Sequence, residues 1–146
     1  MVLQVMITII IQGKGLNMEN AKLEEEIIKK YIIKEKQDRL LWEFNNPKKR
    51  NTVFWHFAGP NFFKSECLHS LAYMSSDVMK RYLQQLSNAK NVYFVGESYI
   101  GSLSLEQAVT KAQTGEICII YCGKGIGYYQ GEQENGKPTR FLLSAR

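Results

Sequence analysis

The sequence is poor in the residues from which most catalytic and metal sites are built. Its 146 residues include only two histidines and three cysteines, namely Cys67, Cys118 and Cys122. A cysteine count that is odd and low implies no disulfide framework. Cys118 and Cys122 lie in a stretch typical of a strand, where their Cα atoms would be about 13 Å apart, too far for a bridge. We therefore expect buried thiols and a reducing compartment, the cytoplasm.

Long hydrophobic runs are also absent, since spanning a bilayer needs about 20 residues and the longest run, residues 2–11, has the sequence VLQVMITIII. No Lys or Arg precedes this run, as a signal peptide would require. Residues 13–15 (GKG) can be encoded by a purine-rich stretch that resembles a bacterial ribosome-binding site, shortly before Met18. We expect a bacterial protein in which residues 1–17 are a non-native leader or disordered and residues 18–146 form a single α+β domain. A buried extra strand and a membrane anchor are the alternatives for the leader.

A strong charge of one sign is missing too. The formal net charge is +5, and the excess lies in residues 1–90, which carry 14 Lys and Arg against 9 Asp and Glu. This bias is weaker than the dense basic stripes of dedicated nucleic-acid binders. Hydrophobic residues make up 45% of the chain and aromatic residues 12%, which excludes a disordered polypeptide and is typical of a globular domain with its own core.

The first half of the chain is predicted to be helical. Apolar residues recur at helical spacing over residues 20–44, which predicts one long amphipathic helix that stops before Asn46-Pro47. Residues 52–57 are rich in β-formers and can be either a second helix or a strand. A less regular helical segment is expected over residues 61–73, followed by a helix that Ser76 caps.

The second half is predicted to consist mainly of strands, at residues 92–95, 116–122, 126–130 and 139–144. The second of these is apolar on both faces and is therefore expected to be central. Ser104 and Gln107 have capping-box spacing for a short helix between the first two strands, and this strand–helix–strand unit can form a right-handed parallel crossover. A polar loop is expected at residues 131–138. The predicted fold class is α+β, with N-terminal helices packed on a C-terminal, mostly antiparallel sheet of about four strands.

One short motif resembles a catalytic element. Residues 96–101 (GESYIG) follow the first predicted strand and resemble the nucleophile elbow of serine carboxypeptidases, which lifts a reactive serine above an α/β-hydrolase sheet. The elbow needs a small residue where this chain has the β-branched Ile100. In that fold the histidine follows the serine, whereas His56 and His69 both precede Ser98. We therefore expect an ordinary turn between a strand and a helix.

Two further groups of residues could carry chemistry. Residues 123–127 (GKGIG) resemble a phosphate-cradling loop, but a strand-like sequence follows them instead of a helix, which favours a glycine hairpin. His56, Cys67 and His69 can act as metal ligands or as a Cys–His nucleophilic pair only if the fold brings them together. We therefore expect no catalytic set, no metal site and no cofactor.

The densest cluster of charge lies where the long predicted helix ends. Lys48, Lys49 and Arg50 are consecutive, and Trp42 and Trp55 stand on either side of them. Cations beside exposed rings can bind an acidic protein surface, because Trp and Arg concentrate binding energy at interfaces. They can also contact phosphates while the rings stack on bases. A solvated loop with the rings packed in the core beneath it is the alternative.

The sequence therefore favours a small cytoplasmic, non-enzymatic binding or regulatory module of unknown target. We expect these five residues to bind a partner protein, and an edge strand of the sheet could accept a partner as well. No membrane partner is expected, and the oligomeric state stays open. The alternatives are a basic nucleic-acid-binding module and a small enzyme with a site assembled from scattered polar residues. Residues available to such an enzyme are His56, Cys67, Glu97, Ser98 and Tyr99.

Overall fold

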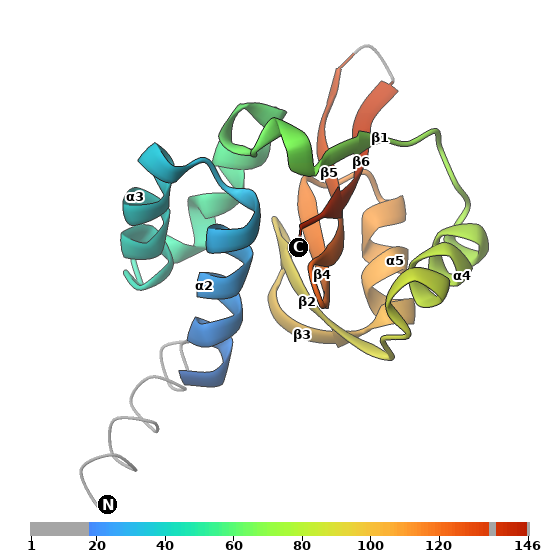
Figure 1. The fold of residues 1–146 in the computed structure, drawn as a ribbon, viewed down its shortest axis with the longest axis horizontal. Helices are drawn as coiled ribbons and strands as arrows, with labels where there is room; N and C mark the ends of the chain where they lie inside the picture. The colour runs from blue at the N-terminus through green and yellow to red at the C-terminus, as the bar shows by residue number, and fades with distance from the viewer. Residues whose placement is uncertain (1–17, 135–136, 146) are drawn as a thin grey trace, which may run out of the picture.

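The computed structural model describes residues 18–134 and 137–145. In these ranges six strands form one antiparallel sheet, in the order β1-β6-β5-β4-β2-β3 (Figure 1). The elements in chain order are α2 (Met18–Tyr31), α3 (Lys34–Phe44), η1 (Arg50–Phe57), η2 (Pro60–Phe62), η3 (Ser65–Cys67), β1 (Leu68–Ser70), α4 (Ser76–Ser87), β2 (Asn91–Gly96), β3 (Ile100–Ser104), α5 (Leu105–Gln113), β4 (Cys118–Gly123), β5 (Ile126–Glu134) and β6 (Lys137–Ser144). The expected leader, residues 1–17, lies outside the described residues.

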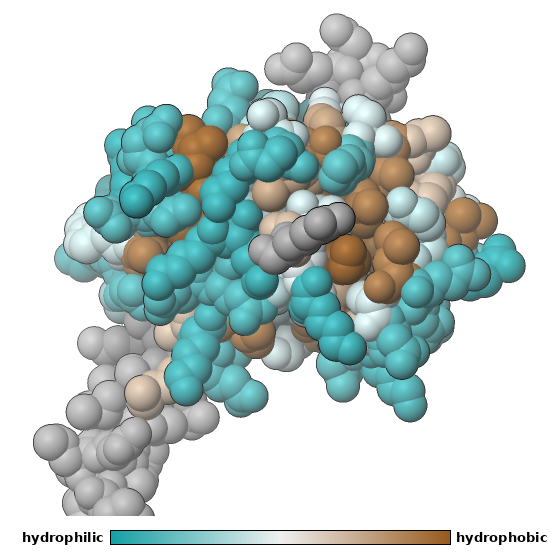
Figure 2. Space-filling model, in the orientation of Figure 1, coloured by the Kyte–Doolittle hydropathy of each residue, from teal (hydrophilic) through white to brown (hydrophobic). Residues whose placement is uncertain are grey.

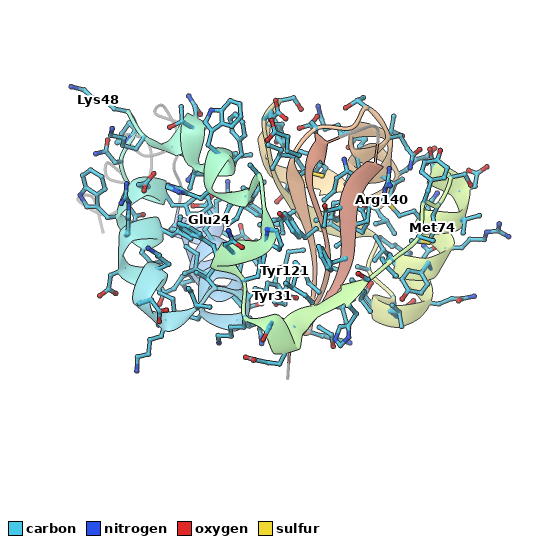
Figure 3. All side chains as sticks on the ribbon, turned by 90° about the horizontal axis from the view of Figure 1, so that it is seen from above. Glu24, Tyr31, Lys48, Met74, Tyr121 and Arg140 are labelled. Carbon is cyan, nitrogen blue, oxygen red and sulfur yellow. The ribbon has the colours of Figure 1, made fainter. Side chains whose placement is uncertain are left out.

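The predicted α+β class is confirmed, but helices cover both faces of the sheet. Figures 1 and 3 show the sheet between two helical layers, with α2 and α3 on one side and α4 and α5 on the other. The described part of the sheet has six strands where about four were expected. Two hydrophobic cores result, one on each face.

The central strands form these two cores because their residues alternate between faces. On β2, Tyr93 and Val95 belong to the core beneath α2 and α3, whereas Val92 and Phe94 belong to the core beneath α4 and α5. β4 alternates in the same way and lies between β2 and β5. A strand that is buried on both faces has a nearly continuous run of apolar residues in its sequence. The prediction of a central strand at residues 116–122 is therefore confirmed.

The single long helix predicted over residues 20–44 is wrong, because it breaks at Ile32 and Ile33. Ile33 has the extended backbone angles φ −58° and ψ 144°, and Ile32 forms an isolated bridge with Phe63. The backbone N–H of Lys64 also donates to the carbonyl of Tyr31 at 2.7 Å. A distant segment thus replaces the hydrogen bonds that a continuous helix would have made. Nowhere in the described ranges is there a helix with the length and apolar character needed to cross a membrane.

The parallel crossover that the sequence allowed between residues 92 and 122 does not form, and the sheet is antiparallel there, as expected for most of it. β2 pairs with β4 antiparallel, with Tyr93 opposite Tyr121. The reason is a strand that was not expected: β3 returns alongside β2 before α5 begins, so the chain enters β4 from the opposite end. The capping box that starts α5 is confirmed, since Ser104 and Gln107 satisfy each other's backbone N–H groups.

The glycine hairpin predicted at residues 123–127 is confirmed. β4 and β5 pair antiparallel on either side of it, and Lys124 and Gly125 have φ angles of +55° and +78°. Two consecutive left-handed residues are typical of the tight turns that match the twist of a hairpin. A Cβ at Gly125 would lie 1.8 Å from the carbonyl oxygen of Ala145, so only glycine fits. The loop turns the chain and has no helix behind it to bind phosphate.

Four local expectations are settled or corrected. Residues 52–57, left open between helix and strand, belong to the 3-10 helix η1. The helical segment expected over residues 61–73 is reduced to short 3-10 turns, because strand β1 pairs with β6 there. The polar loop expected at residues 131–138 is largely strand, since β5 and β6 stay paired to their ends. The cap of α4 is Ser75, one residue earlier than predicted.

A buried ion pair joins the helical layer to the sheet. The Arg50 guanidinium donates from Nη1 to Oε1 of Glu24 at 2.7 Å and from Nη2 to Oε2, and Nη1 also donates to the carbonyl of Phe44 at 3.0 Å. The Tyr93 hydroxyl donates to Oε2 of Glu24. The two charged residues are 2% and 4% exposed, and Figure 3 shows Glu24 inside this layer. The cluster thus fixes α2, the end of α3, η1 and β2 relative to one another.

The protonation states suit this cluster. Burial disfavours the charge of Arg50, but the hydrogen bond and the charge of Glu24 outweigh it and raise the pKa of Arg50 above its ordinary value. Burial, and next the negative charge of Glu24, raise the pKa of Tyr93 well above its ordinary value, so the hydroxyl stays a donor. Arg50 therefore stays a cation and Tyr93 keeps its hydroxyl proton, as their hydrogen bonds to Glu24 require.

The variant Arg50→Met tests this cluster. It leaves the Glu24 carboxylate buried without its cation, and breaking one side of a buried pair costs about 3–5 kcal/mol. We expect the free energy of unfolding, measured by urea denaturation at neutral pH, to fall by that amount. Arg81→Met, at an exposed position of α4, is the matched control and should change it by less than about 0.5 kcal/mol. Equal stability of the two variants would contradict the role of the pair.

Candidate docking surface

Two exposed indoles lie on the helical layer formed by α3 and η1. Trp42 lies on α3 and Trp55 on η1, and each is 57% exposed. The turn between these elements carries Lys48 and Lys49, which are exposed as well. Figure 3 shows Lys48 pointing away from the body of the molecule. We call these four residues the α3–η1 surface, and Trp is a residue that proteins usually bury.

The turn that carries the lysines is held by side chains bonded to nearby backbone. The amide of Asn45 donates to the carbonyl of Leu41 at 2.9 Å, which closes the end of α3. The side-chain oxygen of Asn46 accepts from the N–H of Lys48 at 3.0 Å, and the hydroxyl of Thr52 donates to the carbonyl of Lys49 at 3.1 Å. Such bonds favour turns over continued helix. The lysines therefore sit on an ordered segment.

A polar cluster of side chains binds α3 to η1. Nε2 of His56 lies 2.9 and 3.0 Å from the two carboxylate oxygens of Glu43. Nε of Arg39 donates to the same carboxylate at 3.1 Å. The imidazole also stacks on Phe62, with ring centroids 4.9 Å apart. Since Glu43 follows Trp42 in sequence and His56 follows Trp55, these contacts fix the backbone on which both indoles stand.

The cluster determines the charge of its carboxylate. Burial by itself would raise the pKa of Glu43, but hydrogen bonds from His56 and Arg39 outweigh it and lower this pKa below its ordinary value. Glu43 is therefore ionised, and its carboxylate is bound by Arg39 and His56 within the protein. Its negative charge does not offset the lysines of the surface.

One residue predicted to bind a partner is placed elsewhere. Arg50 is 4% exposed and is engaged by Glu24 and Tyr93, so it faces the interior and cannot contact a partner protein. The physical reason is the turn of η1, which directs Arg50 inward while Lys48 and Lys49 precede the helix on the exposed side. The other four predicted residues are exposed on α3, η1 and the turn between them, and their binding role stays a prediction.

The residues of the alternative enzyme are not joined by any contact among the described residues. His56 contacts Glu43 and Phe62, whereas the Cys67 thiol donates to the carbonyl of Lys30. Burial raises the pKa of Cys67, which keeps it a thiol and a poor nucleophile. Cys67 and His69 do line one cavity. In the part of the chain that the structure describes, no group of three or more His, Cys, Asp or Glu residues could hold a metal ion.

Ser98 occupies a hairpin loop, and not a nucleophile elbow. The residues around it connect two strands, β2 and β3, where a turn between a strand and a helix was expected. Its hydroxyl donates to the Glu116 carboxylate at 2.9 and 3.0 Å and accepts from the ammonium of Lys111 at 3.3 Å. Glu97 accepts from the N–H of Ile117. These bonds pin the loop to the start of β4 and leave Ser98 without a basic imidazole.

The edges of the sheet are poorly suited to receive a strand from a partner. At one edge, the Tyr99 hydroxyl donates to the carbonyl of Ser102 at 3.3 Å, and the N–H of Ser104 donates to the Gln107 side chain. The strand at the other edge, β1, is three residues long. Short or occupied edge strands are a common protection against unwanted pairing. The α3–η1 surface is therefore the stronger candidate for a docking site.

Comparison with known proteins gives no family for this chain. No family model matches it, and searches of curated proteins and of solved structures found no match. Any function must therefore be inferred from the chain's own residues.

Sequence reasoning missed the polar cluster that joins α3 to η1. Arg39 and Glu43 have the four-residue spacing of a helical ion pair, and this signal is visible in the sequence. Their connection to His56 is not visible, because it depends on how the turn folds η1 back onto α3. The burial of Arg50 could not be predicted either, because it too depends on how the turn places η1 against α3.

Glu43→Gln tests the cluster through its pH dependence. Because the folded-state pKa of Glu43 is lowered, its contribution to stability is present above the ordinary value of 4.5 and is lost as the pH falls through the folded-state pKa. We expect the variant to be less stable at neutral pH and to lose less stability than the wild type on acidification. Urea denaturation at several pH values measures both effects. Glu35→Gln, at an exposed position of the same helix, should keep the wild-type profile; an unchanged profile for Glu43→Gln would contradict the pairing.

Proposed function

We propose that this chain is a small, non-enzymatic module that binds an acidic protein surface through the α3–η1 surface. The observation that carries the proposal is the pair of exposed indoles, Trp42 and Trp55, beside Lys48 and Lys49. Exposed Trp residues next to cations are the composition of energetic hot spots at protein interfaces. Three free cysteines support placing the module in a reducing compartment, the cytoplasm.

The charge of the surrounding segment supports an acidic partner. The sequence has no Asp or Glu from Phe44 to Ser65, and the carboxylate just before this segment, Glu43, is buried by its own contacts. The exposed lysines therefore have no negative charge of the same segment close by. Complementary charge on a partner would steer the encounter and fix its orientation.

Order in the free protein also supports binding. Association loses less free energy when interface side chains and loops are already fixed. The Arg39–Glu43–His56 cluster holds the two elements together, and the side-chain bonds of the turn hold the lysines. The tryptophans, with only two rotatable side-chain bonds each, lose little freedom on contact.

An affinity-capture comparison tests the proposal. Immobilised wild-type chain should retain a protein with an acidic surface from native lysate, and Trp42→Ala and Trp55→Ala should each lose it, because hot-spot truncations cost about 2 kcal/mol or more. The Lys48→Ala/Lys49→Ala double variant should bind more weakly and with a smaller dependence on salt. Tyr73→Ala, which removes an exposed aromatic ring at another site, is the control and should retain the partner.

The retained material distinguishes the proposal from its alternative. If the wild type and the two tryptophan variants retain the same proteins, the docking role of the surface is contradicted. If single-stranded nucleic acid is retained, and its affinity falls steeply with salt, the nucleic-acid reading replaces the protein-binding one. Trp42 and Trp55 are the only tryptophans of the chain, so intrinsic fluorescence of the purified protein reports directly on binding at this surface.

A further inference from the structure

A cavity of about 490 Å³ opens at the end of α2, and its lining shares no residue with the α3–η1 surface. In Figure 1 the end of α2, the segment around η3 and the end of β6 come together on the side facing the viewer. Figure 2 shows mostly hydrophilic side chains over α2 on this face, whereas hydrophobic ones gather between the sheet and α4. The residues that line the cavity are Lys30, Lys64, Glu66, Cys67, His69, Ser144 and Ala145.

The end of a helix normally repels anions, but here its free carbonyls are covered. The ammonium of Lys64 donates to the carbonyl of Lys29 at 2.9 Å, and its backbone N–H donates to that of Tyr31 at 2.7 Å. The Cys67 thiol donates to the carbonyl of Lys30. Three consecutive carbonyls at the negative end of the dipole are thus occupied by donors of one segment. The same bonds hold the cavity wall in place.

The remaining polar groups of the cavity are available to a ligand. Among the described residues, the ammonium of Lys30, the imidazole of His69 and the hydroxyl of Ser144 have no hydrogen-bond or ion-pair partner. Lys64 uses one of its three N–H donors. Among the described residues of the lining, Glu66 is the only acidic one. Two lysines, a histidine and a serine thus border one space, together with a single described carboxylate.

The cavity is built for binding and not for thiol chemistry. Cys67 is 4% exposed, and burial, together with the nearby charge of Glu66, raises its pKa. A thiol in that state is neither a good nucleophile nor a ready metal ligand. What the lining offers is the positive charge of Lys30 and Lys64, the ring N–H of His69 and one carboxylate at Glu66.

We propose that this cavity binds the phosphate group of a small hydroxylated phosphate ester. A phosphate dianion presents three strong acceptor oxygens, which match the donors of Lys30, Lys64, His69 and Ser144. Glu66 would repel bare phosphate but would accept a hydrogen bond from a hydroxyl group elsewhere on the ligand. The lining therefore favours an ester over inorganic phosphate. This site is independent of the docking surface and of the function proposed for it.

The test is a titration of the ¹⁵N-labelled protein, followed by amide chemical shifts, with glycerol phosphate and with inorganic phosphate. Glycerol and sodium chloride at matched ionic strength serve as blanks. We expect saturable shifts around residues 64–69, with glycerol phosphate binding more tightly. Lys30→Ala and His69→Ala should each weaken binding about tenfold, the usual loss for a charge-assisted hydrogen bond. Lys22→Ala, at an exposed position of the same helix, should bind like the wild type.

A further variant tests the specificity separately. Glu66→Gln should strengthen binding of inorganic phosphate and reduce the preference for the ester. Absence of saturable shifts with both phosphates, or wild-type affinity in Lys30→Ala and His69→Ala, would overturn the proposal. Trp42→Ala should bind glycerol phosphate normally, so a failure here is distinct from a failure of the docking surface.

Discussion

The structure depends most on one buried contact, the ion pair between Glu24 and Arg50. It connects α2 to η1, reaches the last carbonyl of α3 at Phe44, and receives a hydroxyl from Tyr93 on the sheet. Buried ion pairs seldom add much net stability, because both ions lose their hydration. What this pair supplies is geometry: it allows one arrangement of three helical elements on the sheet, since any other would leave a charge unpaired in the core.

The docking surface follows from that arrangement. Trp55 stands on the helix whose first residue is Arg50, and Trp42 stands two residues before Phe44, the carbonyl that Arg50 binds. The interior contact therefore sets the spacing of the two exposed rings. The Arg39–Glu43–His56 cluster repeats the constraint nearer the surface. The buried Glu24–Arg50 pair and the Arg39–Glu43–His56 cluster thus hold α3 and η1 in one arrangement. An interface that is ordered before binding loses less free energy on association.

Local patterns predicted what is local in this fold. The capping box of α5, the hairpin at Gly125 and the central strand β4 depend on neighbouring residues or on alternation, and the sequence shows both. The break at Ile33 was missed because its cause is a segment about thirty residues away that bonds to the end of α2. Of the five residues expected in the docking surface, four are exposed on α3, η1 or the turn between them. Arg50 is not, because its partner Glu24 is 26 positions away and nothing in a run of three cations distinguishes the one that turns inward.

The break between α2 and α3 connects the two candidate sites. A continuous helix would have satisfied its own carbonyls at residues 29–31, leaving nothing for the segment around Lys64 to bind and no wall for the cavity at that end. It would also have carried Trp42 away from η1, since α3 turns back only after Ile33. The donors of Lys64 and Cys67 that bind the end of α2 therefore form a wall of the cavity. By ending α2 they also allow α3 to pack beside η1. The cavity lies at the end of α2, whereas the two indoles stand on α3 and η1, so a ligand in the cavity would reach the surface by moving α3 relative to α2. The buried Glu24–Arg50 pair opposes that movement, so the two sites should act independently unless the pair is broken.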